Sequence, residues 1–160
     1  MAQEIERKFL VKGDFRTDVS ESHHIMQGYL CSDPRRTVRV RVLDNQGFIT
    51  IKGRPHSPGH FAKYEWEKEI PVTEAEELMR LCDDGIIDKI RHIVPYEGHI
   101  YEVDEFHGSN EGLFMAEVEL KSEDEPFVKP VWLGDEVTFD SRYYNSYLRK
   151  HPYLSWRTEK

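Results

Sequence analysis

The sequence predicts a mostly β, α+β protein built from short antiparallel strands. Apolar and polar residues alternate in short runs, which is the period of a strand with one buried face. Clusters of Gly, Asn and Pro, such as "DNQG" and "HGSNEG", separate the runs at hairpin length. Closure of the sheet is one way to remove its edges. The predicted strands are Glu4–Val11, Ile25–Leu30, Thr37–Leu43, Phe48–Lys52, Ala62–Ile70, Lys89–Pro95, His99–Phe106 and Leu113–Lys121.

Helices are predicted at two places between or after these strands. Thr73–Glu76 fits a capping box, and apolar residues follow at helical spacing until Asp84–Gly85 ends the run. A second helix is predicted from Asp140–Ser141 to His151–Pro152, where proline ends it. A shorter turn or helix is predicted over Phe15–Ser22.

Length and composition indicate a single domain over residues 1–160, with room for a real core. Charged residues make up 32% of the chain, against about 25% in ordinary domains. The net charge of −8 argues against a general nucleic-acid or anionic-membrane surface. Cys31 and Cys82 lack the spacing of zinc ligands. Without a signal-like N-terminus or a long apolar run, the protein is expected to be soluble and cytoplasmic.

Like charges recur at every second position of the predicted strands, which places each pair on one strand face. The pairs are Glu4 with Glu6, Arg39 with Arg41, Glu65 with Glu67, Lys89 with Arg91, Glu102 with Asp104, and Glu117 with Glu119. The residues between and beside them are mostly apolar and define the opposite faces. The charged faces are therefore either the outside of the protein or the inside of a closed barrel.

Two observations favour the inside. Like charges on one face repel, and solvated faces usually mix the two signs, whereas here acidic and basic strands are separate. That separation suggests a ligand or metal that neutralises each group. Arginine fills the "VRVRV" pair, and its planar fork suits bidentate contacts with phosphate oxygens.

The two sets of charges together predict metal-assisted phosphoryl transfer. Carboxylates are hard oxygen ligands that suit Mg²⁺ or Mn²⁺ better than zinc. The acidic set is Glu4, Glu6, Glu65, Glu67, Glu102, Asp104, Glu117 and Glu119. The basic set, which could cradle an anion, is Lys8, Arg39, Arg41, Lys52, Lys89 and Arg91.

Other motifs do not support a different chemistry. The eight histidines are scattered, and the sequence has neither a GxxxxGK[ST] phosphate loop nor a GxSxG elbow. Tyr143, Tyr144 and Tyr147 could stack a base, but packing of an amphipathic helix is the better interpretation.

The order of these motifs resembles the CYTH superfamily, also called triphosphate tunnel metalloenzymes. "EIERK" is similar to the family's ExExK signature, and "RVRV", "TIKG", "YEWEKEIP", "YEVDEFHG", "AEVELKSE" and "DSRYYNSYL" follow in the family's order. The resemblance runs from Glu4 to about Leu148 and is greatest to the short single-domain bacterial members.

This resemblance implies a closed antiparallel eight-stranded β-barrel, a tunnel, with flanking helices. The implied metal ligands are Glu4, Glu6, Glu65, Glu67, Asp104, Glu117 and Glu119. The implied substrate-binding residues are Lys8, Arg39, Arg41, Lys52, Lys89, Arg91 and Arg142. The implied catalytic residues are Glu4, Glu6, Lys8, Lys52 and Arg142. The resemblance leaves open which acid of "EWEKE" touches metal. Asp104 is favoured over Glu102 only by the resemblance.

The leading hypothesis is a hydrolase of linear triphosphates that depends on Mg²⁺ or Mn²⁺, with inorganic tripolyphosphate as substrate. A class IV-type adenylate cyclase and a thiamine triphosphatase are the alternative enzymes. A polyphosphate- or nucleotide-binding module and a structural β protein with solvated charges are the alternatives without turnover. The expected partner is a small-molecule triphosphate rather than nucleic acid or membrane, and a homodimer is compatible with the family.

Overall fold

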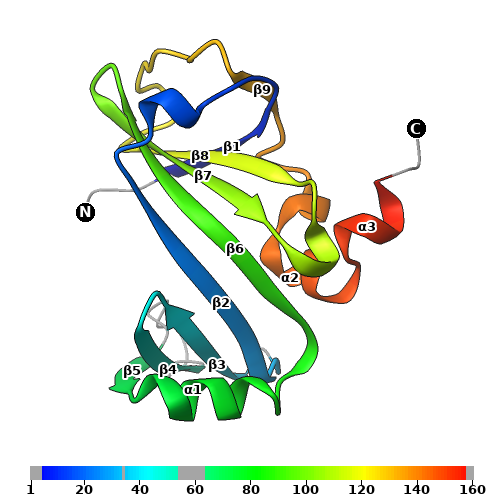
Figure 1. The fold of residues 1–160 in the computed structure, drawn as a ribbon. Coiled ribbons are helices and arrows are strands. Elements are labelled where there is room, and N and C mark those ends of the chain that lie inside the picture. The colour runs from blue at the N-terminus through cyan, green and yellow to red at the C-terminus, as the bar shows by residue number, and fades with distance from the viewer. Residues whose placement is uncertain (1–4, 34, 54–63, 158–160) are drawn as a thin grey trace. The chain divides into compact units, whose positions relative to one another are not determined.

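The computed structural model describes residues 5–33, 35–53 and 64–157, and its mostly antiparallel β class confirms the prediction (Figure 1). One sheet has the strand order β5-β4-β3-β2-β6-β7-β8-β1-β9. The strands are β1 Ile5–Val11, β2 Glu21–Cys31, β3 Arg36–Leu43, β4 Gln46–Gly53, β5 Tyr64–Ile70, β6 Asp83–Tyr96, β7 His99–Phe106, β8 Phe114–Leu120 and β9 Leu133–Glu136. The α-helices are α1 Val72–Met79, α2 Asn145–Lys150 and α3 Tyr153–Trp156, and the 3₁₀ helices are η1 Arg16–Asp18, η2 Gly108–Asn110 and η3 Ser141–Tyr143.

The chain divides into two compact units. The first unit contains residues 1–23 and 89–160, and the second unit contains residues 24–88. A single domain over the whole chain stays a prediction.

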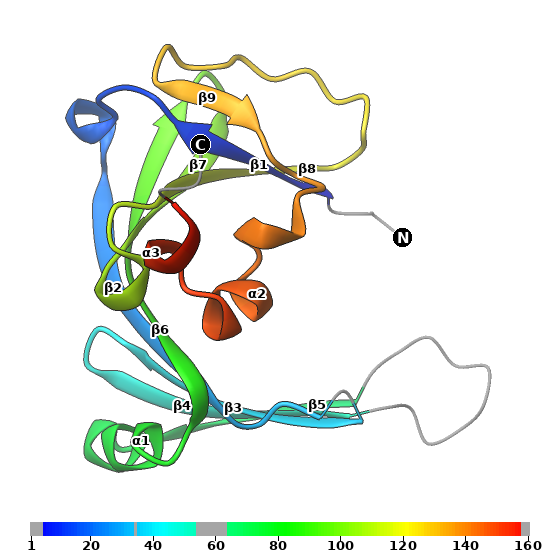
Figure 2. The ribbon, with the colours of Figure 1, turned by 90° about the vertical axis from the view of Figure 1, so that its right-hand side faces the viewer.

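Alternation along the strands of the first unit gives its sheet one apolar and one charged face. Tyr101 pairs with Val118, and Phe9 pairs with Ala116, so these side chains share a face. Together with Phe15, Trp132 and other apolar side chains they form a buried core. In Figure 2 the chain around β9 lies on one side of β1 and β8, and α2 lies on the other.

The second unit buries the apolar face of β3 and β4 under α1. Val40 and Val42 pack with Ala75 and Met79 in one core cluster. A Cβ atom at Gly47 would lie 2.7 Å from the Ala75 Cβ, so only glycine allows the helix this close to β4. The charged alternates of β3, β4 and β5 therefore lie on the face that α1 does not cover.

The predicted helix boundaries differ from those in the structure. Pro71, in an extended conformation, precedes the first residue of α1, so Thr73 lies inside the helix and the capping box is wrong. The helix ends at Met79, and Asp84–Gly85 belongs to β6. The second predicted helix is interrupted at Tyr144, whose extended backbone separates η3 from α2.

The remaining differences concern short elements. η1 confirms a short helical turn within Phe15–Ser22, and the structure adds α3 after Pro152. Strand β9 is a further addition to the eight predicted strands, because its four residues are too few to show alternation. In the described part of the chain, no helix is long and apolar enough to cross a bilayer.

Candidate functional site

Strand register gathers most of the predicted site residues of the first unit on its charged face. Glu6 pairs with Glu119, and Lys8 pairs with Glu117 across β1 and β8. Glu117 also pairs with Glu102 of β7. Directly opposed residues of antiparallel strands point to the same side, so their side chains form one charged surface. Glu4, the first residue of the predicted signature, lies outside the described residues.

Four carboxylates of this face line a pocket of about 300 Å³, which we call the acidic pocket. Its lining residues are Glu6, Ile100, Glu102, Glu117 and Glu119. Burial raises the pKa of Glu117, and the hydrogen bond and negative charge of Glu6 raise this pKa further; the charges of Lys8 and Arg91 oppose the rise. The pocket therefore buries and crowds its carboxyl groups enough that Glu117 holds its proton at pH values where a free glutamate has lost it.

Asp104 lies on the same face but is held by two cations. Its Oδ2 atom lies 3.0 Å from the Lys89 Nζ, and its Oδ1 atom accepts a hydrogen bond of 2.8 Å from the Arg91 Nε. Burial favours the neutral form of Asp104, but the charges and hydrogen bonds of Lys89 and Arg91 outweigh it and lower the pKa. The structure thus places this predicted metal ligand in a buried ion-pair network, and it places Glu102 in the acidic pocket.

The other two predicted cations of the first unit have different surroundings. The Lys8 Nζ lies 4.6 Å from the centre of the Tyr144 ring. The Arg142 Nε and Nη2 donate hydrogen bonds to Asp140, which raises the pKa of the guanidinium and lowers that of the carboxyl group. Arg142 also lies 5.3 Å from the Trp156 ring centre. The structure therefore brings Lys8 beside the acidic pocket but binds Arg142 to Asp140.

The acidic pocket has the chemistry for a hard divalent cation. Its donors are carboxylate oxygens, and a bound cation would relieve the repulsion between Glu6 and Glu117. Among the described residues, no three His, Cys, Asp or Glu side chains converge closely enough to hold an ion as they stand. The donor type therefore fits Mg²⁺ or Mn²⁺.

Strand register also gathers the charged residues of the second unit on one face. Arg39 pairs with Thr50, and Thr50 pairs with Glu67. The Thr50 Oγ1 donates a hydrogen bond of 2.8 Å to Glu67, and the Arg39 Nη2 lies 4.0 Å from the same carboxylate. Lys52 lies 3.8 Å from Glu65.

The two arginines of this face have different partners. The Arg41 Nε and Nη2 donate hydrogen bonds of 3.1 and 2.9 Å to the Oε1 of Gln27, which is buried. Within the described ranges, the buried Arg39 Nε has no hydrogen-bond partner. An unpaired buried donor is costly, and a phosphate oxygen is a ligand that would satisfy it.

Sequence reasoning did not identify Gln27, Thr50 and Tyr144 as supports of the charged residues. Thr50 could have been predicted from the sequence, because Thr50 stands two positions before Lys52 and therefore lies on the same strand face. Gln27 and Tyr144 reach Arg41 and Lys8 from other elements, so only the register of the strands and the fold reveal them.

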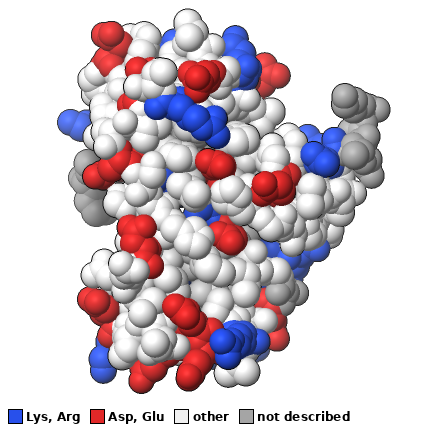
Figure 3. Space-filling model, viewed as in Figure 1, with Lys and Arg blue, Asp and Glu red and all other residues white. Residues whose placement is uncertain are grey.

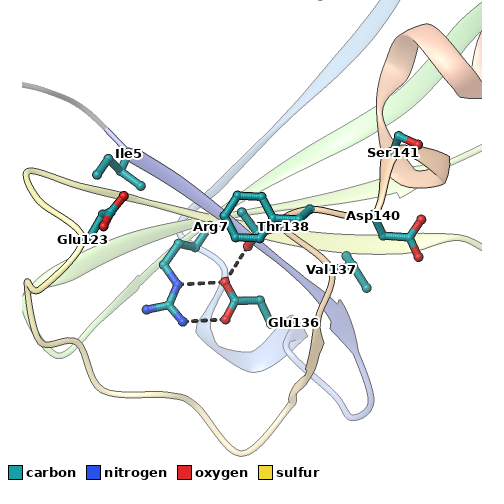
Figure 4. A pocket seen from close by; sticks show the side chains of 9 residues that line it. Ile5, Arg7, Glu123, Glu136, Val137, Thr138, Asp140 and Ser141 are labelled. Atoms are coloured by element: carbon teal, nitrogen blue, oxygen red, sulfur yellow. Dashed lines mark hydrogen bonds and ion pairs between the residues drawn. The ribbon is translucent and has the colours of Figure 1, made fainter.

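A larger hollow of the first unit, of about 900 Å³, shares no described lining residue with the acidic pocket; its lining is drawn in Figure 4. Arg7 and Glu136 form an ion pair at this hollow, and the Arg7 Nε lies 2.8 Å from the Glu136 carboxylate. This hydrogen bond lowers the pKa of Glu136 to about 2. On the molecular face in Figure 3, acidic and basic side chains are interspersed, as on an ordinary solvated surface.

A sheet face that carries carboxylates together with Arg and Lys has the donors that a metal ion and a phosphorylated ligand require. The CYTH domain model matches residues 2–150. The chain belongs to the CYTH family, as its motifs indicated.

Similar proteins include enzymes named for triphosphate hydrolysis. An inorganic triphosphatase of Acetivibrio thermocellus is 46% identical over 158 residues, covering 98% of this chain and 99% of the relative. An inorganic triphosphatase of Nitrosomonas europaea is 38% identical over 152 residues, covering 91% of this chain and 95% of the relative. A crystal structure of an inorganic triphosphatase covers 93% of this chain and 95% of its own, with a TM-score of 0.78 and 34% identity.

Proposed function

We propose that this chain is a metal-dependent hydrolase of linear triphosphates and that inorganic tripolyphosphate is its substrate. The relatives that carry the name inorganic triphosphatase align with nearly the whole chain. The observation that carries the metal dependence is the acidic pocket, where Glu6 and Glu117 are crowded together beside Lys8. Crowded carboxylates next to cationic side chains suit a bound metal with a polyphosphate.

Mg²⁺ or Mn²⁺ would be held by Glu6, Glu102, Glu117 and Glu119, with Glu4 as the predicted further ligand. When bound, the ion supplies positive charge that neutralises phosphate oxygens and polarises the phosphoanhydride. Asp104, Glu65 and Glu67 were also predicted as ligands. Each of them contacts cationic side chains, so we give them the role of positioning those side chains.

The basic residues bind and orient the phosphate chain in this proposal. In the first unit, Lys8 and Arg91 stand beside the acidic pocket, and Arg91 also lies 3.6 Å from Glu102. In the second unit, taken by itself, Arg39, Arg41 and Lys52 are proposed as phosphate-binding donors; among the described residues, the buried Arg39 Nε has no hydrogen-bond partner. Arg142 would contribute only after leaving Asp140. Fixed donors of this kind stabilise the charge that develops on phosphate oxygens during attack by water.

The test is a comparison of product release from tripolyphosphate, ATP, thiamine triphosphate and pyrophosphate, with Mg²⁺ and with Mn²⁺. Wild type is compared with Glu117→Gln and with Glu76→Gln, an exposed glutamate of α1 as matched control. We expect metal-dependent phosphate release from tripolyphosphate that falls at least about 100-fold in Glu117→Gln and is unchanged in Glu76→Gln. Cyclic AMP formed from ATP would instead assign a cyclase, and triphosphate binding without product would assign a binding module.

The remaining sequence predictions accompany this function. A small-molecule triphosphate is the proposed partner, and nucleic acid and membrane are not. Cytoplasmic location, a homodimer and a single domain over 1–160 stay predictions. Light scattering on the purified chain would give the oligomeric state.

A further inference from the structure

Tyr144 contacts the Lys8 side chain and is linked to the Lys8 backbone through Thr138. The Lys8 Nζ lies 4.6 Å from the centre of the Tyr144 ring. The Tyr144 hydroxyl donates a hydrogen bond of 2.9 Å to the Thr138 carbonyl oxygen. The Lys8 backbone N–H in turn donates a hydrogen bond of 3.0 Å to the Thr138 Oγ1. Both ends of Lys8 are thereby connected through one tyrosine and one threonine.

The backbone on either side fixes the position of this tyrosine. Tyr144 donates its N–H to the Ser141 carbonyl oxygen, and its own carbonyl oxygen accepts hydrogen bonds from Tyr147 and Leu148 in the first turn of α2. The Val137 N–H donates a hydrogen bond of 2.7 Å to the Lys8 carbonyl oxygen, which holds the chain before η3 against β1. The ring is therefore anchored by its hydroxyl group and by its backbone.

A ring contact holds a lysine differently from a carboxylate. A cation over an aromatic face is attracted by the ring quadrupole, and it keeps its positive charge and its N–H donors. Lys89 differs, because besides lying 5.5 Å from the centre of the Phe106 ring its Nζ is 3.0 Å from the Asp104 carboxylate. A lysine that must bind phosphate oxygens benefits from the ring contact. The ring fixes the position of the flexible four-carbon side chain and leaves the ammonium N–H donors available for phosphate.

We propose that Tyr144 is a positioning residue for Lys8, which it holds ready to bind the phosphate chain beside the acidic pocket. The inference rests on the proposed function for the role of Lys8. The contact between the ring and the ammonium group can be tested without any turnover.

A double-mutant cycle between the two residues tests the proposal. We expect Tyr144→Leu to lower kcat/KM for tripolyphosphate about 5- to 30-fold, the equivalent of one cation–π contact. In a Lys8→Met background the same substitution should change kcat/KM less than about twofold, because the partner is already absent. Tyr144→Phe keeps the ring and should stay within about threefold of wild type. Tyr147→Leu is the control for damage to α2, because the Tyr147 ring stacks on His151.

Nuclear magnetic resonance supplies a readout that a merely structural role would not move. The Lys8 Hε resonances should be shifted upfield by the Tyr144 ring current in wild type and in Tyr144→Phe, and the shift should vanish in Tyr144→Leu. Additive effects in the cycle, or an absent ring-current shift in wild type, would overturn the proposal.

A wild type that hydrolyses no triphosphate would overturn the proposed function. The ring-current shift and the same cycle, measured then on tripolyphosphate binding by calorimetry, would still decide the role of Tyr144.

Discussion

The charged faces of the two units balance their charges in different ways. In the first unit, one carboxylate, Asp104, pairs with the buried Lys89 and with the half-buried Arg91, and four other carboxylates crowd together in the acidic pocket. In the second unit, Arg41 bonds the neutral Gln27, and Arg39 lies 4.0 Å from Glu67. Among the described residues, the buried Arg39 Nε has no hydrogen-bond partner. The first face therefore has crowded carboxylates that a bound cation would relieve, and the second has a buried guanidinium donor that a phosphate oxygen would satisfy. A metal ion is the ligand that suits the first face, and a phosphate group is the ligand that suits the second.

The largest expected effect comes from removing the acid at the centre of the first face. Asp104→Ala would leave Lys89 and Arg91 without their shared counter-charge, and we expect a loss of about 3–5 kcal/mol in the free energy of unfolding. Glu65→Ala breaks an exposed pair with Lys52 in the second unit and should cost less than about 1 kcal/mol. Urea unfolding of both variants checks the difference, and equal losses would contradict the distinction between the two faces.

The next effect concerns the pH dependence of the acidic pocket. The pKa of Glu117 is raised above its ordinary value of 4.5, so the folded protein holds this proton at pH values where the unfolded chain has lost it. Without metal, the free energy of unfolding should therefore fall as pH rises from about 4.5 toward the raised pKa.

Replacement of this carboxyl group should remove the pH-dependent loss. At pH 8 without metal, we expect Glu117→Gln to be more stable than wild type by about 1–3 kcal/mol, and at pH 4 the difference should vanish. Thermal unfolding at the two pH values measures it. A Glu117→Gln variant that is less stable at pH 8 would contradict the raised pKa of Glu117.

A smaller effect is expected from the second unit. Arg39→Ala removes the unpaired donor and one positive charge, so KM for tripolyphosphate should rise about tenfold, as for loss of one charge-assisted contact. Arg36→Ala, at an exposed position of the same strand, is the control and should leave KM unchanged. Steady-state kinetics decide the point, and equal KM values for the two variants would remove Arg39 from the substrate site.

The smallest effect is expected at the surface pair of Arg7 and Glu136. The pKa of Glu136 is lowered to about 2, so its contribution to stability is present above its ordinary pKa of 4.5 and is lost as pH falls through about 2. Because both side chains are partly exposed, Glu136→Gln should cost less than about 1 kcal/mol at pH 7. Urea unfolding between pH 7 and pH 2 measures this, and a cost above 2 kcal/mol would contradict it.

Much of the fold and part of the site could be predicted from the sequence. Alternation in "VRVRV" and "AEVEL" identified strands and their charged faces, because the period of two survives any tertiary arrangement. The resemblance to the CYTH family was confirmed by the match over residues 2–150. The start of α1 was missed because Pro71 takes the place before the helix that Thr73 was expected to occupy.

Partners across strands could not be predicted. Glu102 and Asp104 share one strand face, and only the register shows that Glu102 meets Glu117 while Asp104 meets Arg91. Arg142 was expected at the substrate, but its side chain bonds Asp140 two residues earlier, a local contact that competes with any distant role.

The most direct test of the central claim is a Mn²⁺ titration followed by paramagnetic broadening of backbone resonances. We predict that signals of Glu6, Glu102 and Glu117 broaden first, and that Glu117→Gln weakens the effect at least tenfold. Earlier broadening at exposed acids of α1, such as Glu74 and Glu76, would contradict a metal site in the acidic pocket.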